Sequence, residues 1–282
     1  MSTEATRRDL VDVGGHHIAY TRAGHGPAVV LIHGIPTNAY LWRNVVPSLV
    51  AAGFEAITFD LLGYGASDKP ADADLGIKSQ SEILVEALRA LDCSGGMLVG
   101  HDIGGGVAQL IAVDHPEIVT RLVLVDSIVY DSFPEPGIAR LKDPAWDSIL
   151  GAPDFDLKRG LTKGFTRGMV HANRITPEMI DAYERPFHGI EGRLAYLRAA
   201  RALRTEELSS RMDAVEKLEL PTLVVWGADD VFQPLNAGKH LAQTMANGRF
   251  EVIEHAGHFL PEDVPDALTH LIVAFASSTG AG

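Results

Sequence analysis

The chain has 282 residues, of which 46% are hydrophobic, so it is long enough to bury a large core. Its formal net charge of −13 argues against nucleic acids and anionic membranes as partners, because binding to phosphates requires a basic surface. The single cysteine, Cys93, excludes an intrachain disulfide and suits a reducing compartment. We find no signal peptide and no run long enough to cross a bilayer, so we expect a cytoplasmic protein.

Eight segments of the chain have the pattern of β-strands. Apolar runs predict these strands near residues 8–13, 17–22, 28–33, 55–60, 95–101, 122–127, 221–227 and 249–254. Helical patterns lie between most of them, notably over residues 79–91 and 237–245. Strands that alternate with helices predict an α/β fold, with a mostly parallel eight-stranded sheet covered by helices on both faces.

The alternation of strands and helices stops between residues 132 and 218. Prolines are frequent at the start of this interval, and helical patterns follow over residues 177–183 and 193–203. We interpret residues 132–218 as a helical cap domain inserted after the sixth strand, with 1–131 and 219–282 forming the core domain. Ligands bind at the carboxyl ends of the strands in open α/β sheets, so the cap is expected to enclose a pocket there.

The segment 98–105 has the outline of a nucleophile elbow, with Asp102 in the position of the nucleophile. An apolar strand precedes Asp102, a helical pattern follows it, and nearby glycines permit a sharp turn. The positive end of the helix favours the ionised carboxylate. Asp102 could instead be only a helix N-cap, since aspartate is a preferred capping residue. The motifs further along the chain favour a catalytic role for Asp102.

Two later loops supply an acid and a histidine. Asp230 follows the strand at 221–227, and His258 follows the strand at 249–254. Nucleophile, acid and histidine in this order, each after a strand, is the order of the α/β-hydrolase triad. We therefore interpret Asp102 as the nucleophile, His258 as the base and Asp230 as the acid that orients it. Asp126, after the sixth strand, and Asp229 remain alternatives for the acid.

The strand at 28–33 runs into a His-Gly-Ile-Pro turn. This turn, the elbow and the order of the three triad residues together indicate the family that the chain resembles. Residues 10–275 resemble the α/β-hydrolase superfamily, and within it the aspartate-nucleophile branch that contains haloalkane dehalogenases and epoxide hydrolases. The stretch 33–47 is especially similar to the dehalogenases. The resemblance implies an oxyanion hole formed by the backbone N–H groups of Ile35 and Ile103.

An aspartate nucleophile implies a two-step hydrolysis. Asp102 is expected to displace a leaving group from an sp³ carbon and to form an alkyl ester. His258 is then expected to activate the water that attacks the carboxyl carbon of this ester. The mechanism requires no metal and no organic cofactor. The expected partners are a small hydrophobic organic substrate and water, and we expect a monomer or a homodimer.

Haloalkane dehalogenase-like cleavage is the first hypothesis for the reaction. Well-studied dehalogenases hold the departing halide with a tryptophan next to the nucleophile and with an asparagine in the first turn or a cap tryptophan. This chain has Ile103 and Ile35 at the first two places, and neither side chain donates a hydrogen bond. Trp146 in the cap is a candidate donor of an indole N–H.

Epoxide hydrolysis is the alternative. Epoxide hydrolases use cap tyrosines to protonate the ring oxygen, and the candidates here are Tyr130, Tyr183 and Tyr196. A second alternative is hydrolysis of an ester or lactone through an anhydride at Asp102. A non-catalytic binding protein is a further possibility, although such a protein has no need of all three triad residues.

Overall fold

Eight strands form one sheet, in the order β1-β2-β4-β3-β5-β6-β7-β8, in the computed structural model, which describes residues 8–93 and 95–278. The pairs β1–β2 and β2–β4 are antiparallel, and the other neighbouring strands are parallel. The strand bounds are β1 Arg8–Val13, β2 His16–Ala23, β3 Ala28–Ile32, β4 Glu55–Phe59, β5 Gly96–His101, β6 Val119–Val125, β7 Thr222–Gly227 and β8 Gly248–Ile253. The predicted fold class, with its mostly parallel sheet, is confirmed.

Helices connect most of the strands. In the described part of the chain the α-helices are α1 Val46–Ala51, α2 Ile77–Ala90, α3 Ile103–Asp114, α4 Pro136–Ala139, α5 Ala145–Gly151, α6 Leu157–Gly168, α7 Pro177–Glu184, α8 Gly189–Arg201, α9 Glu206–Ser209, α10 Met212–Glu216, α11 Leu235–Thr244, α12 Leu260–Asp263 and α13 Pro265–Ser277. Short 3-10 helices lie at Ala39–Asn44, Pro116–Ile118, Arg140–Lys142, Ala172–Arg174 and Arg185–Phe187. None of the helices in the described residues has the length and apolar character needed to span a membrane.

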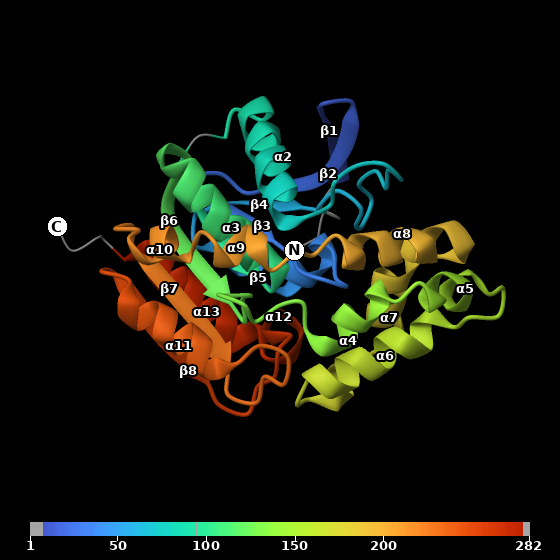
Figure 1. Ribbon diagram of the computed structural model, residues 1–282. Helices are drawn as coiled ribbons and strands as arrows, with labels where there is room; N and C mark the ends of the chain where they lie inside the picture. The colour runs from blue at the N-terminus through green and yellow to red at the C-terminus, as the bar shows by residue number, and fades with distance from the viewer. Residues whose placement is uncertain (1–7, 94, 279–282) are drawn as a thin grey trace.

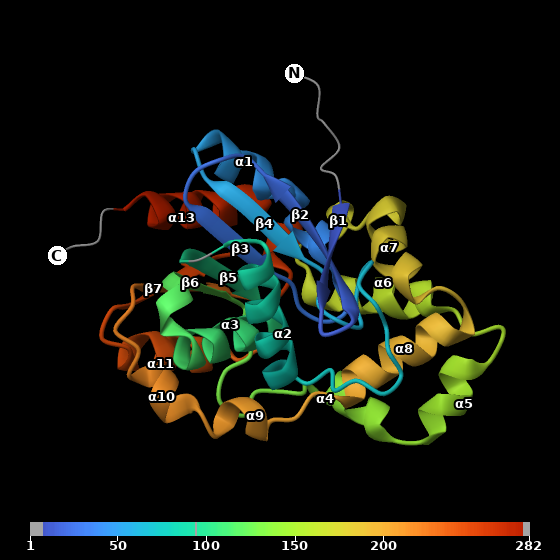
Figure 2. The same cartoon turned by 90° about the horizontal axis from the view of Figure 1, so that it is seen from above.

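The sheet is covered by helices on both faces. In β3, Val30 and Ile32 pack in the cluster that contains α2, α3 and α11, whereas Val29 and Leu31 pack in the cluster that contains α1 and α13. Figure 2 shows α1 and α13 on one side of the sheet and α2, α3 and α11 on the other. Strands that are buried on both faces need apolar side chains at every position, which explains the continuous apolar runs in the sequence.

Every regular element between β6 and β7 is a helix. Helices α4 to α10 follow one another there, and no strand interrupts them in this fully described interval. Figure 1 shows α4 to α8 grouped at the end of the sheet to which the β6 and β7 arrows point, while α9 and α10 return along the core. We call residues 132–218 the helical insertion. It lies where the carboxyl ends of the parallel strands converge.

An ion pair of the core accepts a hydrogen bond from the helical insertion. Arg43 donates from Nη1 and Nη2 to the two carboxylate oxygens of Glu262, at 2.5 and 2.7 Å. The hydroxyl of Tyr183 in α7 donates to the same carboxylate. Tyr183 is fully buried, and its ring stacks on Phe165 of α6. The three polar side chains therefore satisfy one another at the contact between insertion and core.

Candidate active site

Asp102 lies at the sharp turn between β5 and α3. Its φ of 53° places it in the left-handed region, which non-glycine residues rarely adopt outside turns and functional sites. Glycines make the turn possible, since a Cβ atom at Gly104 would press on the main-chain oxygens of Ile32 and His33. The segment therefore has the geometry of the elbow that its sequence pattern predicts.

The loop after β3 holds the Asp102 carboxylate in place. The N–H of Ile35 donates to Oδ1 of Asp102 at 2.9 Å. Burial raises the pKa of Asp102, while His258 and the N–H groups of Ile103 and Ile35 oppose this rise by favouring the charged form. A Cβ at Gly34 would collide with the carboxylate, so the absence of a side chain there lets the loop approach. One carboxylate oxygen thus occupies the predicted oxyanion hole.

His258 lies between two carboxylates and is hydrogen-bonded to one of them. Its Nδ1 is 2.9 Å from Oδ2 of Asp230, whereas its Nε2 is 3.8 Å from Oδ2 of Asp102. The second distance exceeds the range of a hydrogen bond. Burial lowers the pKa of His258, but the Asp230 and Asp102 carboxylates outweigh it and leave the pKa above its usual value. Nε2 is therefore free to accept a proton from a water molecule.

Of the three candidate acids, Asp230 contacts the histidine. Although burial acts to raise it, the pKa of Asp230 is lowered by His258 and by the N–H groups of Gln233 and Phe232. Asp229 is exposed. Asp126 is fully buried, and its Oδ1 accepts a hydrogen bond from the N–H of Gly227 at 2.8 Å. Burial and then the nearby Asp230 raise the pKa of Asp126 well above its usual value.

His101, directly before the nucleophile, is a site residue that the sequence interpretation missed. It is fully buried, and its Nε2 lies 2.9 Å from the main-chain oxygen of His258. Burial and the neighbouring His258 lower the pKa of His101 to about 3, so the ring is neutral and donates from Nε2 to that oxygen. His101 thus positions the loop that carries the base.

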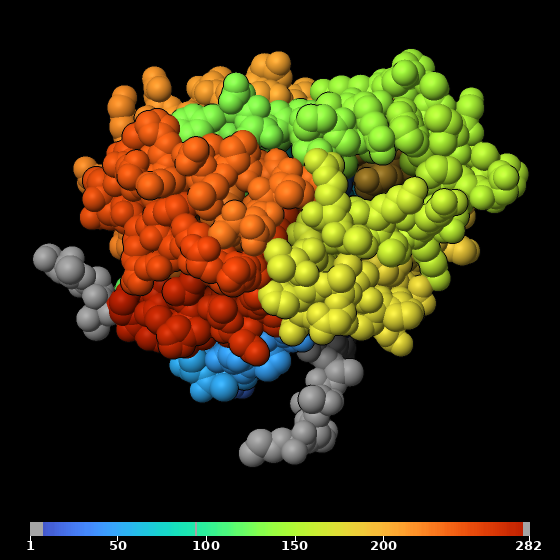
Figure 3. Space-filling view, turned by 90° about the horizontal axis from the view of Figure 1, so that it is seen from below, coloured from blue at the N-terminus to red at the C-terminus, as the bar shows by residue number. Residues whose placement is uncertain are grey.

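A cavity of about 430 Å³ opens above these residues, between the core and the helical insertion. Asp102, Ile35, Ile103 and His258 form one end of its wall. Figure 3 shows a hollow on this face, between the lime segment near residues 135–155 and the yellow-green segment that follows it. Most of the remaining wall is apolar, including Ile128, Phe133, Leu141, Leu161, Leu203 and Phe259. The cavity suits the apolar part of a small organic molecule.

The structure separates the four predicted substrate-binding candidates into two groups. Trp146 and Tyr196 line the cavity. The selection of Tyr130 and Tyr183 is corrected, because neither lies in the cavity wall. Tyr130 donates to Glu216 at 2.8 Å, and Tyr183 donates to Glu262, so each hydroxyl is committed to a carboxylate elsewhere. The sequence could not reveal these partners, which lie 86 and 79 residues away along the chain.

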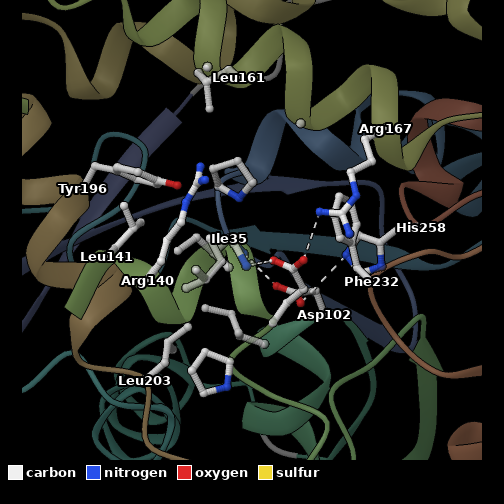
Figure 4. A pocket seen from close by; sticks show the side chains of 18 of the residues that line it. Ile35, Asp102, Arg140, Leu141, Leu161, Arg167, Tyr196, Leu203, Phe232 and His258 are labelled. Atoms are coloured by element: carbon white, nitrogen blue, oxygen red, sulfur yellow. Dashed lines mark hydrogen bonds and ion pairs between the residues drawn. The ribbon is translucent and has the colours of Figure 1, made fainter. Parts of the chain in front are cut away.

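The helical insertion also contributes charged groups to the cavity wall. Glu135, Arg140, Lys163 and Arg167 line the cavity, and none of them was singled out from the sequence. Arg167 donates to Glu135 at 3.0 Å, and its guanidinium lies 4.7 Å from the ring centroid of Phe232. Figure 4 shows Arg167 on the side of Asp102 and His258, and Arg140 and Tyr196 on the other side. The two ends of the cavity thus differ in chemistry.

The fold and the site have known relatives. The profile of a family described as alpha/beta hydrolase fold matches residues 27–265. The chain belongs to this family. As an α/β-hydrolase, it is 30% identical to a fluoroacetate dehalogenase from Burkholderia sp, over 99% of this chain and 96% of that protein. It is 31% identical to a soluble epoxide hydrolase from Corynebacterium sp. (strain C12), over 98% of both chains.

A crystal structure of an alpha/beta hydrolase fold protein from Burkholderia ambifaria superposes on this α/β-hydrolase with a TM-score of 0.86. The two chains are 26% identical, and the match covers 94% of this chain and 97% of the other. The family resemblance predicted from the sequence is confirmed, and with it the interpretation of the chain as a hydrolase.

Proposed function

We propose that this hydrolase cleaves a bond at an sp³ carbon through a covalent alkyl ester on Asp102. The 3.8 Å gap between Nε2 of His258 and Asp102 carries this proposal. A serine nucleophile must give its proton to the histidine and therefore needs a hydrogen bond to it. An aspartate attacks in its ionised form and needs no such bond, so Nε2 of His258 keeps its lone pair for the water of the second step.

The first step uses the carboxylate oxygen that faces the base. Oδ1 of Asp102 is held by the Ile35 N–H, which leaves Oδ2 to attack. An electron pair of Oδ2 forms the new bond to carbon, and the leaving group departs with the electron pair of the broken bond. The apolar side chains of Ile35 and Ile103 line the same end of the cavity and keep bulk water from the reacting carbon.

The second step hydrolyses the ester. His258, oriented by Asp230, takes a proton from a water molecule, whose oxygen attacks the carboxyl carbon of Asp102. The negative charge that develops on Oδ1 is stabilised by the N–H groups of Ile35 and Ile103. Collapse of the intermediate releases an alcohol, which receives the proton from His258, and the carboxyl group of Asp102 then loses the second proton of the water to solvent and becomes a carboxylate again.

Dehalogenation is the reaction that the cavity favours. A fluoroacetate dehalogenase is among the relatives, and the guanidinium of Arg167, which is paired with Glu135, lies on the Asp102 side of the cavity, where an anion would depart. Tyr130 and Tyr183 do not line the cavity, and Tyr196 lies on the opposite side from Asp102 in Figure 4. The cap tyrosines therefore support epoxide opening less than the sequence alone suggested.

Epoxide hydrolysis remains the second candidate, because one relative is a soluble epoxide hydrolase and the Tyr196 hydroxyl lines the cavity. Burial raises the pKa of Tyr196 to about 12, so this hydroxyl is protonated at neutral pH and able to donate. A panel of bromoalkanes, terminal epoxides and simple esters separates the candidates by their products. Halide release, diol formation and acid formation identify dehalogenation, epoxide hydrolysis and ester hydrolysis respectively.

A single turnover in H₂¹⁸O tests the covalent step. If Asp102 attacks carbon, the first alcohol formed contains unlabelled oxygen from Asp102, and the enzyme gains ¹⁸O at this residue. Mass spectrometry of the product and of the peptide that carries Asp102 measures both. Labelled alcohol in the first turnover, with an unlabelled enzyme, would mean that His258 directs water at the substrate and that no alkyl ester forms.

We further propose that residues 132–218 act as the cap domain of this enzyme, because they supply most of the cavity wall opposite the triad. The free and buried Cys93 favours a cytoplasmic location. We also propose that the enzyme is a monomer or a homodimer. Cell fractionation and light scattering test these two assignments.

A further inference from the structure

We infer that the substrate is an organic anion, with the reacting carbon at one end of an apolar chain and a carboxylate at the other, bound by Arg140. The inference rests on the proposed function only for the reacting end. It departs from the sequence-based expectation of a neutral and largely hydrophobic substrate, because the substrate inferred here is an amphiphilic anion. The observations that carry it are the charges in the cavity wall and the free donors beside Arg140.

The cations in the wall outnumber the available carboxylates. Apart from Asp102, the charged side chains lining the cavity are Glu135, Arg140, Lys163 and Arg167. Glu135 is occupied, since it accepts from Arg167 at 3.0 Å and from the N–H of Gly137 at 2.6 Å. Within the described residues, neither Arg140 nor Lys163 has a carboxylate within 4.0 Å. The helical insertion thus presents two unneutralised cations to the cavity.

Arg140 is positioned by an aromatic side chain. Its guanidinium lies 5.2 Å from the centroid of the Trp146 ring, within the range of a cation–π interaction. Such stacking orients the guanidinium and leaves its N–H groups free to bind a carboxylate in a bidentate manner. Arg140 is exposed at its outer side, which is compatible with a carboxylate that enters from solvent.

A second donor accompanies Arg140. Figure 4 shows the Tyr196 hydroxyl beside the Arg140 guanidinium, on the side of the pocket opposite Asp102. In the described part of the chain this hydroxyl has no hydrogen-bond partner. Burial raises the pKa of Tyr196, the positive charge of Arg140 acts to lower it, and Glu135 adds a smaller raising effect. Guanidinium and hydroxyl together form a site for one carboxylate.

The negative charge of the whole chain makes the cations in the cavity wall more distinctive. The protein carries a formal net charge of −13, so its surface as a whole repels anions. A local excess of positive charge in the cavity wall opposes this repulsion where a ligand binds. The predicted substrate differs from a haloacetate, in which carboxylate and reacting carbon are adjacent, because here apolar wall lies between Arg140 and Asp102.

Binding of unreactive alkanoates tests this inference independently of the leaving group. Butanoate, hexanoate, octanoate and decanoate are titrated into the protein by calorimetry, with the alcohol of the same length as the neutral control. We expect the longer alkanoates to bind more tightly than their alcohols, and the difference to shrink as salt is added. Arg140→Gln should weaken alkanoate binding about tenfold and leave alcohol binding unchanged.

Three variants complete the experiment. Arg140→Lys should recover part of the lost affinity, and Lys163→Gln should weaken alkanoate binding by a smaller factor. Lys158→Gln is the matched control, because Lys158 lies on the same helix, is paired with Asp181 and does not line the cavity. Circular dichroism and thermal unfolding verify that each exposed-residue variant is folded.

Equal binding of alkanoates and alcohols to the wild type would overturn the inference, as would an Arg140→Gln variant with unchanged alkanoate affinity. These outcomes are separate from the fate of the proposed function. A protein that binds octanoate through Arg140 but forms no ester on Asp102 retains the anion site and lacks the proposed chemistry. A protein that forms the ester but binds octanoate no better than octan-1-ol lacks the anion site.

Discussion

At the scale of single residues, the proposed function depends on a nucleophile that needs no deprotonation. Asp102 and Asp230 are both buried carboxylates close to His258, yet their roles differ because their partners differ. Asp230 is bound to the histidine and has a lowered pKa, while Asp102 is bound to a main-chain N–H and faces the cavity. The proposed mechanism therefore requires His258 for the second half-reaction and not for the first.

Replacement of His258 by glutamine is expected to accumulate the alkyl-enzyme. The ionised Asp102 still attacks, but no base activates the water, so ester hydrolysis slows by a factor of about 10²–10⁴. Intact-protein mass spectrometry after mixing with a bromoalkane measures the mass added to the variant. Asp102→Ala is the control and should gain no mass. Equal loss of both half-reactions in rapid-mixing experiments would contradict the assigned role.

The pKa of His258 determines the acid limit of ester hydrolysis. The base must be neutral, so hydrolysis should fall as the pH drops through the pKa of His258, which burial lowers and Asp230 raises; the raising effect of Asp102 is lost once its carboxylate is an ester. Asp230→Asn removes the strongest of the raising interactions, so the acid limb should move to lower pH while the maximal rate falls. Single-turnover rates against pH measure both changes. An acid limb at the same pH in the variant would show that Asp230 does not charge-pair with His258.

At the scale of elements, the parallel sheet places residues that are distant in the chain at one edge. The strand ends predicted from apolar runs differ from the observed ends by no more than a few residues, and the largest difference is at β6, which begins at Val119 instead of 122. Val119, Thr120 and Arg121 include polar residues, so an apolar pattern alone cannot include them. The triad was predictable because each member follows such a strand.

The cavity wall was less predictable, because it depends on how the helices of the insertion pack. Tyr183 and Tyr196 both lie on helices of this segment, and sequence patterns do not distinguish them. Their environments differ because Tyr183 donates a hydrogen bond to Glu262, which is distant in sequence, whereas Tyr196 does not. The anion-binding role inferred for Arg140 likewise depends on the neighbouring Trp146 and Tyr196.

Because α3 packs closely against the loop after β3, we expect alanine substitutions at Gly104 and Gly160 to have opposite effects on stability. A methyl group at Gly104 would press on main-chain atoms, so Gly104→Ala should destabilise the protein by about 1–3 kcal/mol and reduce activity further by displacing Asp102. Gly160 in α6 has no atom within 4 Å of the added position, so Gly160→Ala should stabilise it by about 0.5–1 kcal/mol. Urea unfolding measures both. A Gly104→Ala variant as stable as the wild type would show that the loop can withdraw.

At the scale of the whole molecule, we propose that the core supplies the reacting groups and the helical insertion the recognition groups. The two parts must hold a fixed relation for Asp102 and Arg140 to act on one molecule. Contacts between them include the hydrogen bond from Asn38 to the main-chain oxygen of Ala182 at 3.0 Å and the cluster of Arg43, Tyr183 and Glu262. The latter contains a charge pair whose carboxylate is almost fully buried.

Removal of Glu262 is expected to loosen the insertion as well as to destabilise the fold. Glu262→Ala leaves the half-buried Arg43 without a partner and the Tyr183 hydroxyl without an acceptor, and the expected loss is about 3 kcal/mol, at the lower end for a broken buried pair because Arg43 retains some access to water. Urea unfolding gives the loss of stability. The Michaelis constant should rise more than the rate of ester hydrolysis falls, since the triad lies in the core.

The exposed pair between Arg249 and Glu251 on β8 provides the matched control, because it is far from the insertion in the fold and open to solvent. Glu251→Gln removes the same charge and should change stability by no more than about 1 kcal/mol. If Glu262→Ala proves as mild as Glu251→Gln, the insertion is held by apolar packing alone. If it lowers the single-turnover rate of ester hydrolysis and leaves the Michaelis constant unchanged, the cluster supports the triad and not the position of the recognition groups.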